Sequence, residues 1–156
     1  MRVTANKIIT KVDQVGLDFI AQEEGCILHP YLDSVKIPTI GIGCTYYPGG
    51  RKVTMRDPPI TKEQAYALFK NVLATYEKPV WSVTRDDITQ NNFNALVSLT
   101  YNIGVAGFKG STLLKRVNKS PQDAFGIKEA FLMWKNAGGK PVLLSRRKRE
   151  AELYFT

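Results

Sequence analysis

The spacing of hydrophobic and polar positions changes near residue 25. Up to that point non-polar residues recur at the spacing of one helical face, and Gly25 follows as a stop signal. The pattern therefore predicts a first helix over about 13–24. Its non-polar stripe consists of Val12, Val15, Gly16, Phe19 and Ile20.

The next segment has the composition of strands and tight turns. Residues 31–60, YLDSVKIPTIGIGCTYYPGGRKVTMRDPPI, combine β-branched and aromatic residues with glycines and prolines. The triplet PGG is a strong turn signal between two strand-like stretches. We expect a small antiparallel sheet over roughly 30–56, closed by Pro58 and Pro59.

The rest of the chain has helical spacing. Thr61 and Gln64 form a capping box, and a helical stripe follows from Ala65 to Tyr76, which we expect Pro79 to end near residue 78. Further helices are predicted around 93–101, over 111–118, over 121–136 and along the basic segment LLSRRKREAELYF. The 121–136 helix should begin at Ser120-Pro121 and end at Gly138-Gly139, and the glycine-rich YNIGVAGFKGS should be a break.

Strands near one end and helices elsewhere predict an α+β protein. A length of 156 residues fits a single domain. We divide it into an N-terminal helix and β lobe over about 1–60, a connecting helix over 61–80, and a helical lobe over 81–156. A cleft between two such lobes is where an active site is expected.

The charge of the chain indicates an anionic partner. Lys and Arg outnumber Asp and Glu by 22 to 14, a formal charge of +8, which attracts nucleic acid, anionic lipid or an acidic cell-wall polymer. The N-terminal segment never gathers a continuous apolar run, so we expect no signal peptide. No run of about 18 apolar residues occurs, so we expect no stable membrane insertion.

The two cysteines, Cys26 and Cys44, lack the spacing of a disulfide framework and are predicted to be free thiols in a reducing cytoplasm. A zinc site from Cys26, His29 and Cys44 would lack a fourth ligand. We therefore expect no metal and no cofactor, and we interpret His29 as an exposed loop residue.

Candidate chemistry is concentrated at the junction between the first helix and the sheet. Glu24 ends the helix, eight residues separate it from Asp33, and five more separate Asp33 from Thr39. Two carboxyl groups facing each other across a cleft are what glycoside hydrolysis requires, one protonated as acid and one ionised to activate water. Each residue also has a structural interpretation: Glu24 as a solvated acid at a helix end, Asp33 as a turn residue, and Thr39 as an ordinary strand residue. Glu23 is an alternative candidate for the role of Glu24.

The stretch EGCILHPYLDSVKIPTIGIG resembles the catalytic segment of the phage-type lysozymes, glycoside hydrolase family 24. That family has Glu, eight residues, Asp or Cys, five residues, Thr and then an Ile-Gly-x-Gly strand. The similarity continues through ITKEQAYALF, QNNFNALVSLTYNIGVAGFKGSTLLKRVN, FLMWKNAGGK and LLSRRKREAE, so it covers roughly residues 15 to 154. Cys44 stands where the family often has His, and the turn region TYYPGGRKVTMRDPP is longer than in many members.

The resemblance implies a lysozyme-like fold with its active-site cleft between the lobes. It implies hydrolysis of the β-1,4 bond between N-acetylmuramic acid and N-acetylglucosamine in peptidoglycan, inverting, for lysis of the host by a phage. Glu24 is then expected to be the acid, with a pKa raised by burial. Asp33 is expected to activate the attacking water as an ionised base, and Thr39 to hold that water in line with the sugar carbon. The resemblance implies that substrate is bound by Thr45, Tyr101, Asn102, Ser111 and Arg146.

Several of these residues have competing interpretations. Tyr101 continues an apolar stripe, so a core position and a groove position are both open. Arg147, Lys148 and Arg149 are interpreted as a solvated basic run, and Trp134 as a core residue.

Two other functions are weighed against the muramidase. A lytic transglycosylase cleaves the same bond without water and needs only the acid, so Asp33 and Thr39 argue against it. A non-catalytic polyanion-binding virion protein fits the charge, but no basic-aromatic module is present. We therefore expect a monomer without a nucleic-acid partner, made in the host cytoplasm, which depends on a holin to reach the cell wall.

Overall fold

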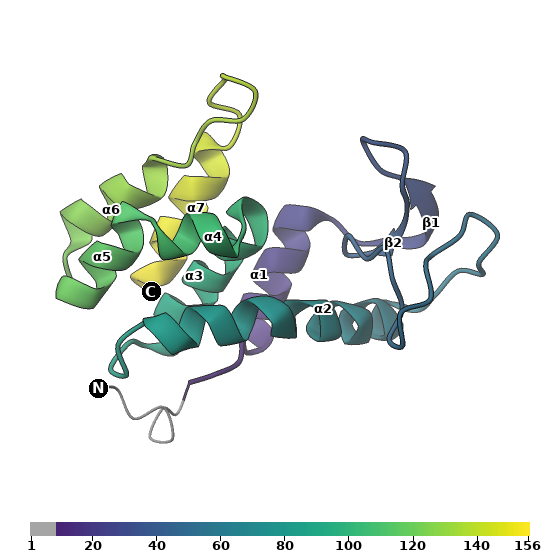
Figure 1. Ribbon diagram of the computed structural model, residues 1–156, viewed down its shortest axis with the longest axis horizontal. Coiled ribbons are helices and arrows are strands. Elements are labelled where there is room, and N and C mark those ends of the chain that lie inside the picture. The colour runs from purple at the N-terminus through teal and green to yellow at the C-terminus, as the bar shows by residue number, and fades with distance from the viewer. Residues whose placement is uncertain (1–8) are drawn as a thin grey trace. The chain divides into compact units, whose positions relative to one another are not determined.

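The computed structural model describes residues 9–156, which form two compact units. The first contains residues 9–16 together with Tyr76–Thr156, and the second is Leu17–Thr75. Residues 1–8, part of the segment in which no signal peptide is predicted, lie outside the described residues. The elements in chain order are α1 (Gln14–Glu24), β1 (Ile27–Leu32), β2 (Pro38–Gly41), α2 (Lys62–Val83), α3 (Gln90–Ile103), α4 (Val105–Lys109), α5 (Thr112–Lys119), α6 (Ala124–Leu132) and α7 (Leu144–Tyr154) (Figure 1).

The unit Leu17–Thr75 contains a two-stranded antiparallel sheet. β1 pairs with β2 so that Tyr31 lies opposite Thr39 and Leu32 opposite Pro38. The strands are joined by a tight turn in which the Lys36 amide donates to the carbonyl of Asp33 at 2.9 Å. Lys36 has a φ of 64°, a left-handed conformation that closes the turn. The first helix is confirmed, although Val15 of its predicted stripe is exposed.

The predicted sheet over 30–56 is wrong in its extent. Regular pairing is limited to 27–41, and within the rest of the predicted segment, up to residue 56, only the isolated bridges Ile40–Cys44 and Tyr46–Lys52 occur. The loop that follows is organised by a side chain, because Asp57 accepts hydrogen bonds from the Tyr47 hydroxyl, the Thr54 amide and the Thr54 hydroxyl. A carboxylate at the centre of a loop replaces the backbone ladder that the β-rich composition suggested.

The sheet packs closely on the start of α2. Gly41 has a φ of +68°, and a Cβ built there would lie 3.4 Å from the Cβ of Ala65, so this position favours glycine for its conformation. The capping box of α2 is confirmed: the Thr61 amide donates to Gln64 Oε1 at 2.8 Å, and the Gln64 amide donates to Thr61 Oγ1 at 3.1 Å. The buried core of this unit includes Leu17, Ile20, Ala21, Ile40, Ile42, Cys44, Val53, Ala65, Phe69 and Leu73.

The predicted end of α2 near residue 78 is wrong, because the helix continues through Pro79 to Val83. Proline removes one helical hydrogen bond and crowds the preceding turn. The residues after it are nevertheless tied into the helical unit. Val80 is fully buried, and the amide and hydroxyl of Thr84 both donate to the Val80 carbonyl. Burial of this last turn offsets the local cost of the proline.

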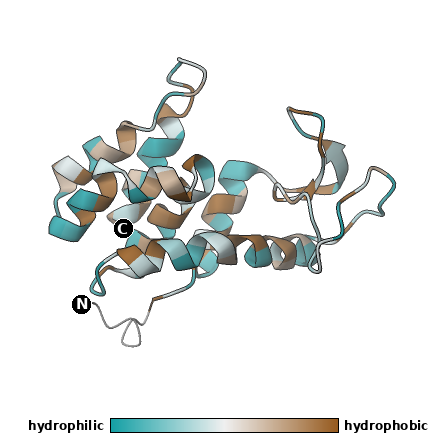
Figure 2. Ribbon diagram, viewed as in Figure 1, coloured by the Kyte–Doolittle hydropathy of each residue, from teal (hydrophilic) through white to brown (hydrophobic). Residues whose placement is uncertain are grey.

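The helical unit is built around α3. This helix packs against α7 and α4, while α6 contacts both α5 and α7. Figure 2 shows that apolar and polar residues follow one another along the ribbons of these helices, as expected for helices with one buried face. The capping box at the start of α3 joins Thr89 and Asn92. The buried core includes Phe93, Leu96, Val97, Leu99, Phe108, Leu113, Val117, Ile127, Phe131 and Tyr154.

Two helix predictions in this unit need correction. The glycine-rich stretch 101–111 was predicted to be a break, but it contains α4. The predicted helix 121–136 is shorter, because it begins after Asp123, whose side chain accepts from the Gly126 amide at 3.0 Å, and ends at Leu132. An aspartate cap therefore starts the helix instead of Pro121. Gly138 and Gly139 lie in a separate tight turn, both at positive φ.

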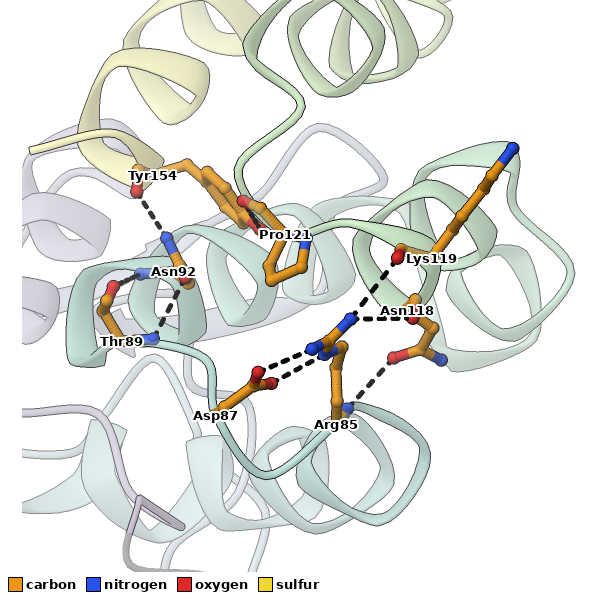
Figure 3. Close-up of polar contacts among 8 residues, drawn as sticks. All are labelled: Arg85, Asp87, Thr89, Asn92, Asn118, Lys119, Pro121 and Tyr154. Carbon is orange, nitrogen blue, oxygen red and sulfur yellow. Dashed lines mark hydrogen bonds and ion pairs between the residues drawn. The ribbon is translucent and has the colours of Figure 1, made fainter.

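A set of polar contacts fastens the C-terminal end of α7 to its neighbours (Figure 3). The Asn92 side-chain amide donates to the Tyr154 carbonyl at 2.6 Å, and the Tyr154 hydroxyl donates to the Pro121 carbonyl at 2.8 Å. Arg85 forms an ion pair with Asp87 at 2.6 Å and donates to carbonyls at the end of α5. These bonds fix the ends of several helices. Among the described residues, no helix has the length and apolarity needed to span a bilayer.

Candidate active site

The end of α1 places Glu24 at the start of the β segment. Glu24 is the last helical residue and is half-buried. Gly25 follows with a φ of +83°, and its amide donates to the Ala21 carbonyl at 2.8 Å. A left-handed glycine of this kind ends a helix sharply. The backbone therefore leaves the helix axis directly after the carboxyl group that the spacing predicts to be catalytic.

Asp33 is held rigidly in the β1–β2 turn. Its Oδ1 accepts hydrogen bonds from the amides of Val35 and Ile37, both at 2.9 Å. Its own amide donates to the Ile37 carbonyl at 3.0 Å. Within residues 9–156 the second oxygen, Oδ2, accepts no hydrogen bond. Asp33 is thus both a turn residue and a fixed carboxylate with one oxygen available for another partner.

Thr39 lies in β2 with a buried side chain, 2% exposed. Its hydroxyl donates to the Ile37 carbonyl at 2.8 Å. A hydroxyl has one proton and two lone pairs. Because the proton is used by the backbone, Oγ1 presents acceptor capacity to any further partner.

The register of the sheet brings Asp33 and Thr39 to one face together with Tyr31. Tyr31 lies directly opposite Thr39, and Asp33 follows Tyr31 by two residues, the interval that returns a strand side chain to the same face. Burial raises the pKa of the Tyr31 phenol, and the negative charges of Asp33 and Glu24 raise it further. Both candidate carboxyl groups therefore act on the phenol of Tyr31.

Tyr31 is a further candidate residue that sequence reasoning missed. The signal for it was present, since Tyr31 and Asp33 have strand spacing and Asp33 was already a candidate. The register with β2 could not be read from the sequence, because it depends on where the turn falls. The candidate residues of this unit are therefore Glu24, Tyr31, Asp33 and Thr39, and Tyr31 lies opposite Thr39 in the sheet.

The cysteines and histidine of this unit have no evident catalytic arrangement. Cys44 is buried, its thiol lies 3.7 Å from the Ile42 carbonyl, and burial raises its pKa to about 11. Cys26 is exposed, and both thiols are free. His29 is exposed as predicted, but it lies in β1 instead of a loop. Among the described residues, His, Cys, Asp and Glu form no group of three that could hold a metal.

The predicted binding residues are distributed over both units. Thr45 lies in the unit Leu17–Thr75, is half-buried, and its carbonyl accepts from the Val53 amide at 2.9 Å. In the helical unit, Tyr101 is half-buried and packs edge-on against Tyr76, with ring centroids 5.1 Å apart. Asn102 beside it is exposed. Tyr101 therefore combines an aromatic packing contact with partial exposure.

Ser111 and Trp134 have structural contacts in the helical unit. Ser111 is 4% exposed, and its hydroxyl donates to the Phe108 carbonyl and accepts from the Leu114 amide. It is the N-cap of α5. Trp134, predicted as a core residue, is half-buried and packs near Gly107. The Ser111 hydroxyl thus serves the helix in this structure.

Arg146 is part of a buried charged cluster within the helical unit. Its Nε donates to Glu150 Oε2 at 3.2 Å, and the Ser98 hydroxyl donates to the same oxygen at 2.5 Å. Arg147 Nε lies 2.7 Å from Glu150 Oε1. Burial raises the pKa of Glu150, while Arg147, Ser98 and Arg146 act in the opposite direction.

The prediction that Arg147 is part of a solvated basic run is wrong. Arg147 is fully buried, whereas Lys148 and Arg149 are exposed as predicted. The residue is buried because Glu150, three positions later on the same helix face, provides a carboxylate for its guanidinium. The sequence alone does not reveal this pairing, because the buried arginines and the exposed Lys148 and Arg149 are consecutive and differ only in the face of the helix on which they lie.

The unit Leu17–Thr75 contains the types of side chain that bond cleavage by water requires. It contains a half-buried carboxyl at a helix end, a second carboxylate fixed by backbone amides, and a threonine oxygen able to accept. A proton donor and a base that activates water are the two parts of glycoside hydrolysis. The unit Leu17–Thr75 has a candidate side chain for each part.

Comparison with known proteins agrees with this chemistry. The family model described as phage lysozyme matches residues 21–150. The chain is 39% identical over 147 residues to the endolysin of Salmonella phage P22, covering 94% of this chain and 99% of that protein.

Solved structures show the same similarity. A crystal structure of a P22 lysozyme mutant matches with a TM-score of 0.86 at 37% identity, over 95% of this chain and all of the other. An endolysin from the Escherichia coli phage FAHEc1 matches with a TM-score of 0.83, also at 37% identity, over 92% of each chain.

Proposed function

The chain belongs to the phage lysozyme family and is a phage endolysin with muramidase activity, and from this premise we propose its mechanism. The bond cleaved is the β-1,4 linkage between N-acetylmuramic acid and N-acetylglucosamine in peptidoglycan, and the anomer is inverted. Glu24 is the general acid, and Asp33 with Thr39 directs the attacking water. The shared face of Asp33, Tyr31 and Thr39 is the observation that supports this assignment best.

Glu24 fits the acid because of its position at the end of α1. A carboxyl that protonates a leaving oxygen must carry its proton until the glycosidic bond breaks. Glu24 is half-buried. In the reaction its proton moves to the glycosidic oxygen as the bond to the anomeric carbon breaks.

Asp33 fits the base because backbone amides fix it in place. Two hydrogen bonds to Oδ1, from the amides of Val35 and Ile37, fix the orientation of the carboxylate. Oδ2 can then accept a proton from water. Thr39 Oγ1 offers a second acceptor on the same face, which restricts the orientation of that water.

Substrate binding is proposed for Thr45, Tyr101, Asn102 and Arg146. Partial exposure of Thr45, Tyr101 and Asn102 leaves aromatic and polar surface for sugar rings. A guanidinium group suits acetamido or carboxyl oxygens of the glycan, and Glu150 holds that of Arg146 in place. Ser111 acts indirectly in this proposal, because its hydroxyl caps α5.

In the infected cell, we propose that the protein is a monomer that accumulates in the host cytoplasm and depends on a holin. The observation in favour is the similarity to phage endolysins along most of the chain. Expression in a bacterial host should lyse cells only after the inner membrane is permeabilised. Lysis without permeabilisation would contradict the dependence on a holin and leave the muramidase activity unaffected.

The stereochemistry of the first product tests the inverting mechanism. When water attacks directly from the face opposite the leaving group, a β bond yields the α anomer, and room for the water requires carboxyl groups about 6.5–9.5 Å apart. Nuclear magnetic resonance of soluble peptidoglycan oligosaccharides during cleavage should show this anomer first. A β product would indicate a covalent route, and an anhydro sugar at the new end would indicate a lytic transglycosylase.

A further inference from the structure

Tyr31 has a hydroxyl that the fold itself does not use. Its side chain is half-buried, and within residues 9–156 the hydroxyl forms no hydrogen bond. By contrast, Tyr47 and Tyr66 in the same unit donate to Asp57 and Asp18. A partly buried hydroxyl without a protein partner, on the same face as two candidate catalytic groups, is suited to a partner that arrives with the reaction.

The neighbouring groups restrict what that partner is. Asp33 Oδ2 and Thr39 Oγ1 are both acceptors, because the Asp33 carboxylate is ionised when it acts as base and the Thr39 proton is donated to the Ile37 carbonyl. A water bound between them donates one O–H to each. Its two lone pairs then remain, and only one of them is needed to attack the anomeric carbon.

We propose that Tyr31 is a catalytic residue that donates a hydrogen bond to the attacking water and so completes its orientation. The inference rests on the proposed function. A water molecule has four tetrahedral directions, of which Asp33 and Thr39 take the two protons and Tyr31 takes one lone pair. The remaining lone pair is the one that attacks the sugar, so the three side chains together define its direction.

The electrostatics of the site suit a donor at this position. Burial, and then the charges of Asp33 and Glu24, raise the pKa of the Tyr31 phenol, so it stays protonated throughout the pH range in which carboxyl groups act as acid and base. A neutral donor orients the water without adding a charge beside Asp33. Tyr31 releases no proton in the step.

The step balances with the groups named. The bond between the anomeric carbon and the leaving oxygen breaks as a new bond forms from that carbon to the water oxygen. The water proton moves to Asp33, and the proton of Glu24 moves to the leaving oxygen. The two carboxyl groups exchange protons with solvent before the next cycle, and Tyr31 is unchanged.

The variant Tyr31→Phe tests the proposal, with Tyr46→Phe as a matched control. Tyr46 lies in the same unit, is 50% exposed, and loses the same single oxygen atom. With soluble peptidoglycan oligosaccharides as substrate, Tyr31→Phe should lower kcat about tenfold, as expected for one hydrogen bond made in the transition state. KM and the melting temperature should stay near wild type, and Tyr46→Phe should match wild type in all three.

A double-mutant cycle with Thr39→Val separates water orientation from substrate binding. If the hydroxyls of Tyr31 and Thr39 hold the same water, the variant with both Tyr31→Phe and Thr39→Val should lose about as much kcat as Thr39→Val alone. Once Thr39→Val has removed the fixed orientation of the water, loss of the Tyr31 hydroxyl has little further effect. Additive losses in kcat, or a Tyr31→Phe enzyme with a raised KM and normal kcat, would overturn the proposal. Normal kcat in Tyr31→Phe would overturn it as well.

A parallel measurement on Glu24→Gln distinguishes failure of the role proposed for Tyr31 from failure of the role proposed for Glu24. An inactive Glu24→Gln beside a fully active Tyr31→Phe would refute only the role of Tyr31. A fully active Glu24→Gln would refute the proposed acid, and with it the reaction on which the role of Tyr31 rests.

Discussion

At the scale of single residues, the buried cluster around Glu150 shows how charge is used inside the helical unit. One carboxylate contacts the guanidinium groups of Arg146 and Arg147 and accepts from the Ser98 hydroxyl. All four residues are buried. Removing one partner from such a cluster leaves an uncompensated charge, which costs more than the intact interaction contributes.

Replacement of Glu150 by Ala should therefore destabilise the protein strongly. The variant leaves two buried guanidinium groups without their shared carboxylate, for which a loss of about 3–5 kcal/mol in the free energy of unfolding is expected. Urea denaturation measures this loss directly. Lys148→Ala, in the exposed part of the same helix, should change the free energy by about 0.5 kcal/mol or less. Equal effects of the two variants would show that the Glu150 cluster does not stabilise the helical unit.

The sequence was sufficient to propose some of the candidate residues but not to find others, whose positions depend on tertiary structure. Glu24, Asp33 and Thr39 lie within one short segment at a characteristic spacing, so they could be proposed as site residues without a structure. The position of Tyr31 opposite Thr39 depends on strand register, and the burial of Arg147 depends on the orientation of α7. Both are tertiary properties that local patterns do not contain.

At the scale of elements, the loop after β2 is organised by Asp57. The Thr54 amide, the Tyr47 hydroxyl, the Thr54 hydroxyl and the Arg51 guanidinium all donate to this carboxylate, and Arg51 also stacks over the Tyr47 ring at 4.2 Å. These bonds hold the pKa of Asp57 well below its usual range, the backbone bond from Thr54 acting most strongly. The ionised form is the one that orders the loop.

The contribution of Asp57 should depend on pH in a defined direction. Its pKa is lower in the folded than in the unfolded protein, so its stabilisation is fully present above the unfolded value of about 3.9 and declines as the pH falls below it. Asp57→Asn should lower the melting temperature near pH 7, and the difference from wild type should narrow below about pH 4. A difference that is constant from pH 7 to pH 3 would contradict the role of the carboxylate.

The element predictions succeeded where local signals determine the outcome. The capping boxes at Thr61 and Thr89 fix helix starts, and that at Thr61 was predicted from the sequence. The sheet was predicted too long because β-rich composition does not reveal that a carboxylate organises the loop. The helix α2 was predicted too short because the cost of Pro79 is local, whereas the burial of Val80 that offsets it is tertiary.

At the scale of the whole molecule, the α+β class predicted from the sequence is confirmed as a lysozyme-like fold, mostly helical with a small two-stranded sheet. The class could be predicted because strand signals are confined to one segment and the helical stripes to the others. The charge of +8 acts at the same scale. It favours encounter with an anionic wall without specifying the chemistry.

Lysis should therefore slow as the ionic strength rises. Salt shortens the range of electrostatic attraction to about 8 Å at physiological strength and further above it, which weakens steering toward the wall. Turbidity loss of a peptidoglycan suspension over a series of salt concentrations measures this, with cleavage of a short soluble peptidoglycan oligosaccharide, which carries far fewer charges, as control. A flat profile for the suspension would mean that the positive charge does not promote encounter with the wall.

The central claim, that Glu24 is the acid of this muramidase, is tested most directly by wall lysis with Glu24→Gln beside wild type and Glu23→Gln. The amide keeps the shape of the acid but cannot protonate the leaving oxygen, and general acid catalysis contributes typically about 10²–10⁴-fold. Glu24→Gln should thus lose at least about 10²-fold in activity with an unchanged melting temperature, while Glu23→Gln stays near wild type. Lysis by a folded Glu24→Gln at the wild-type rate would contradict the account.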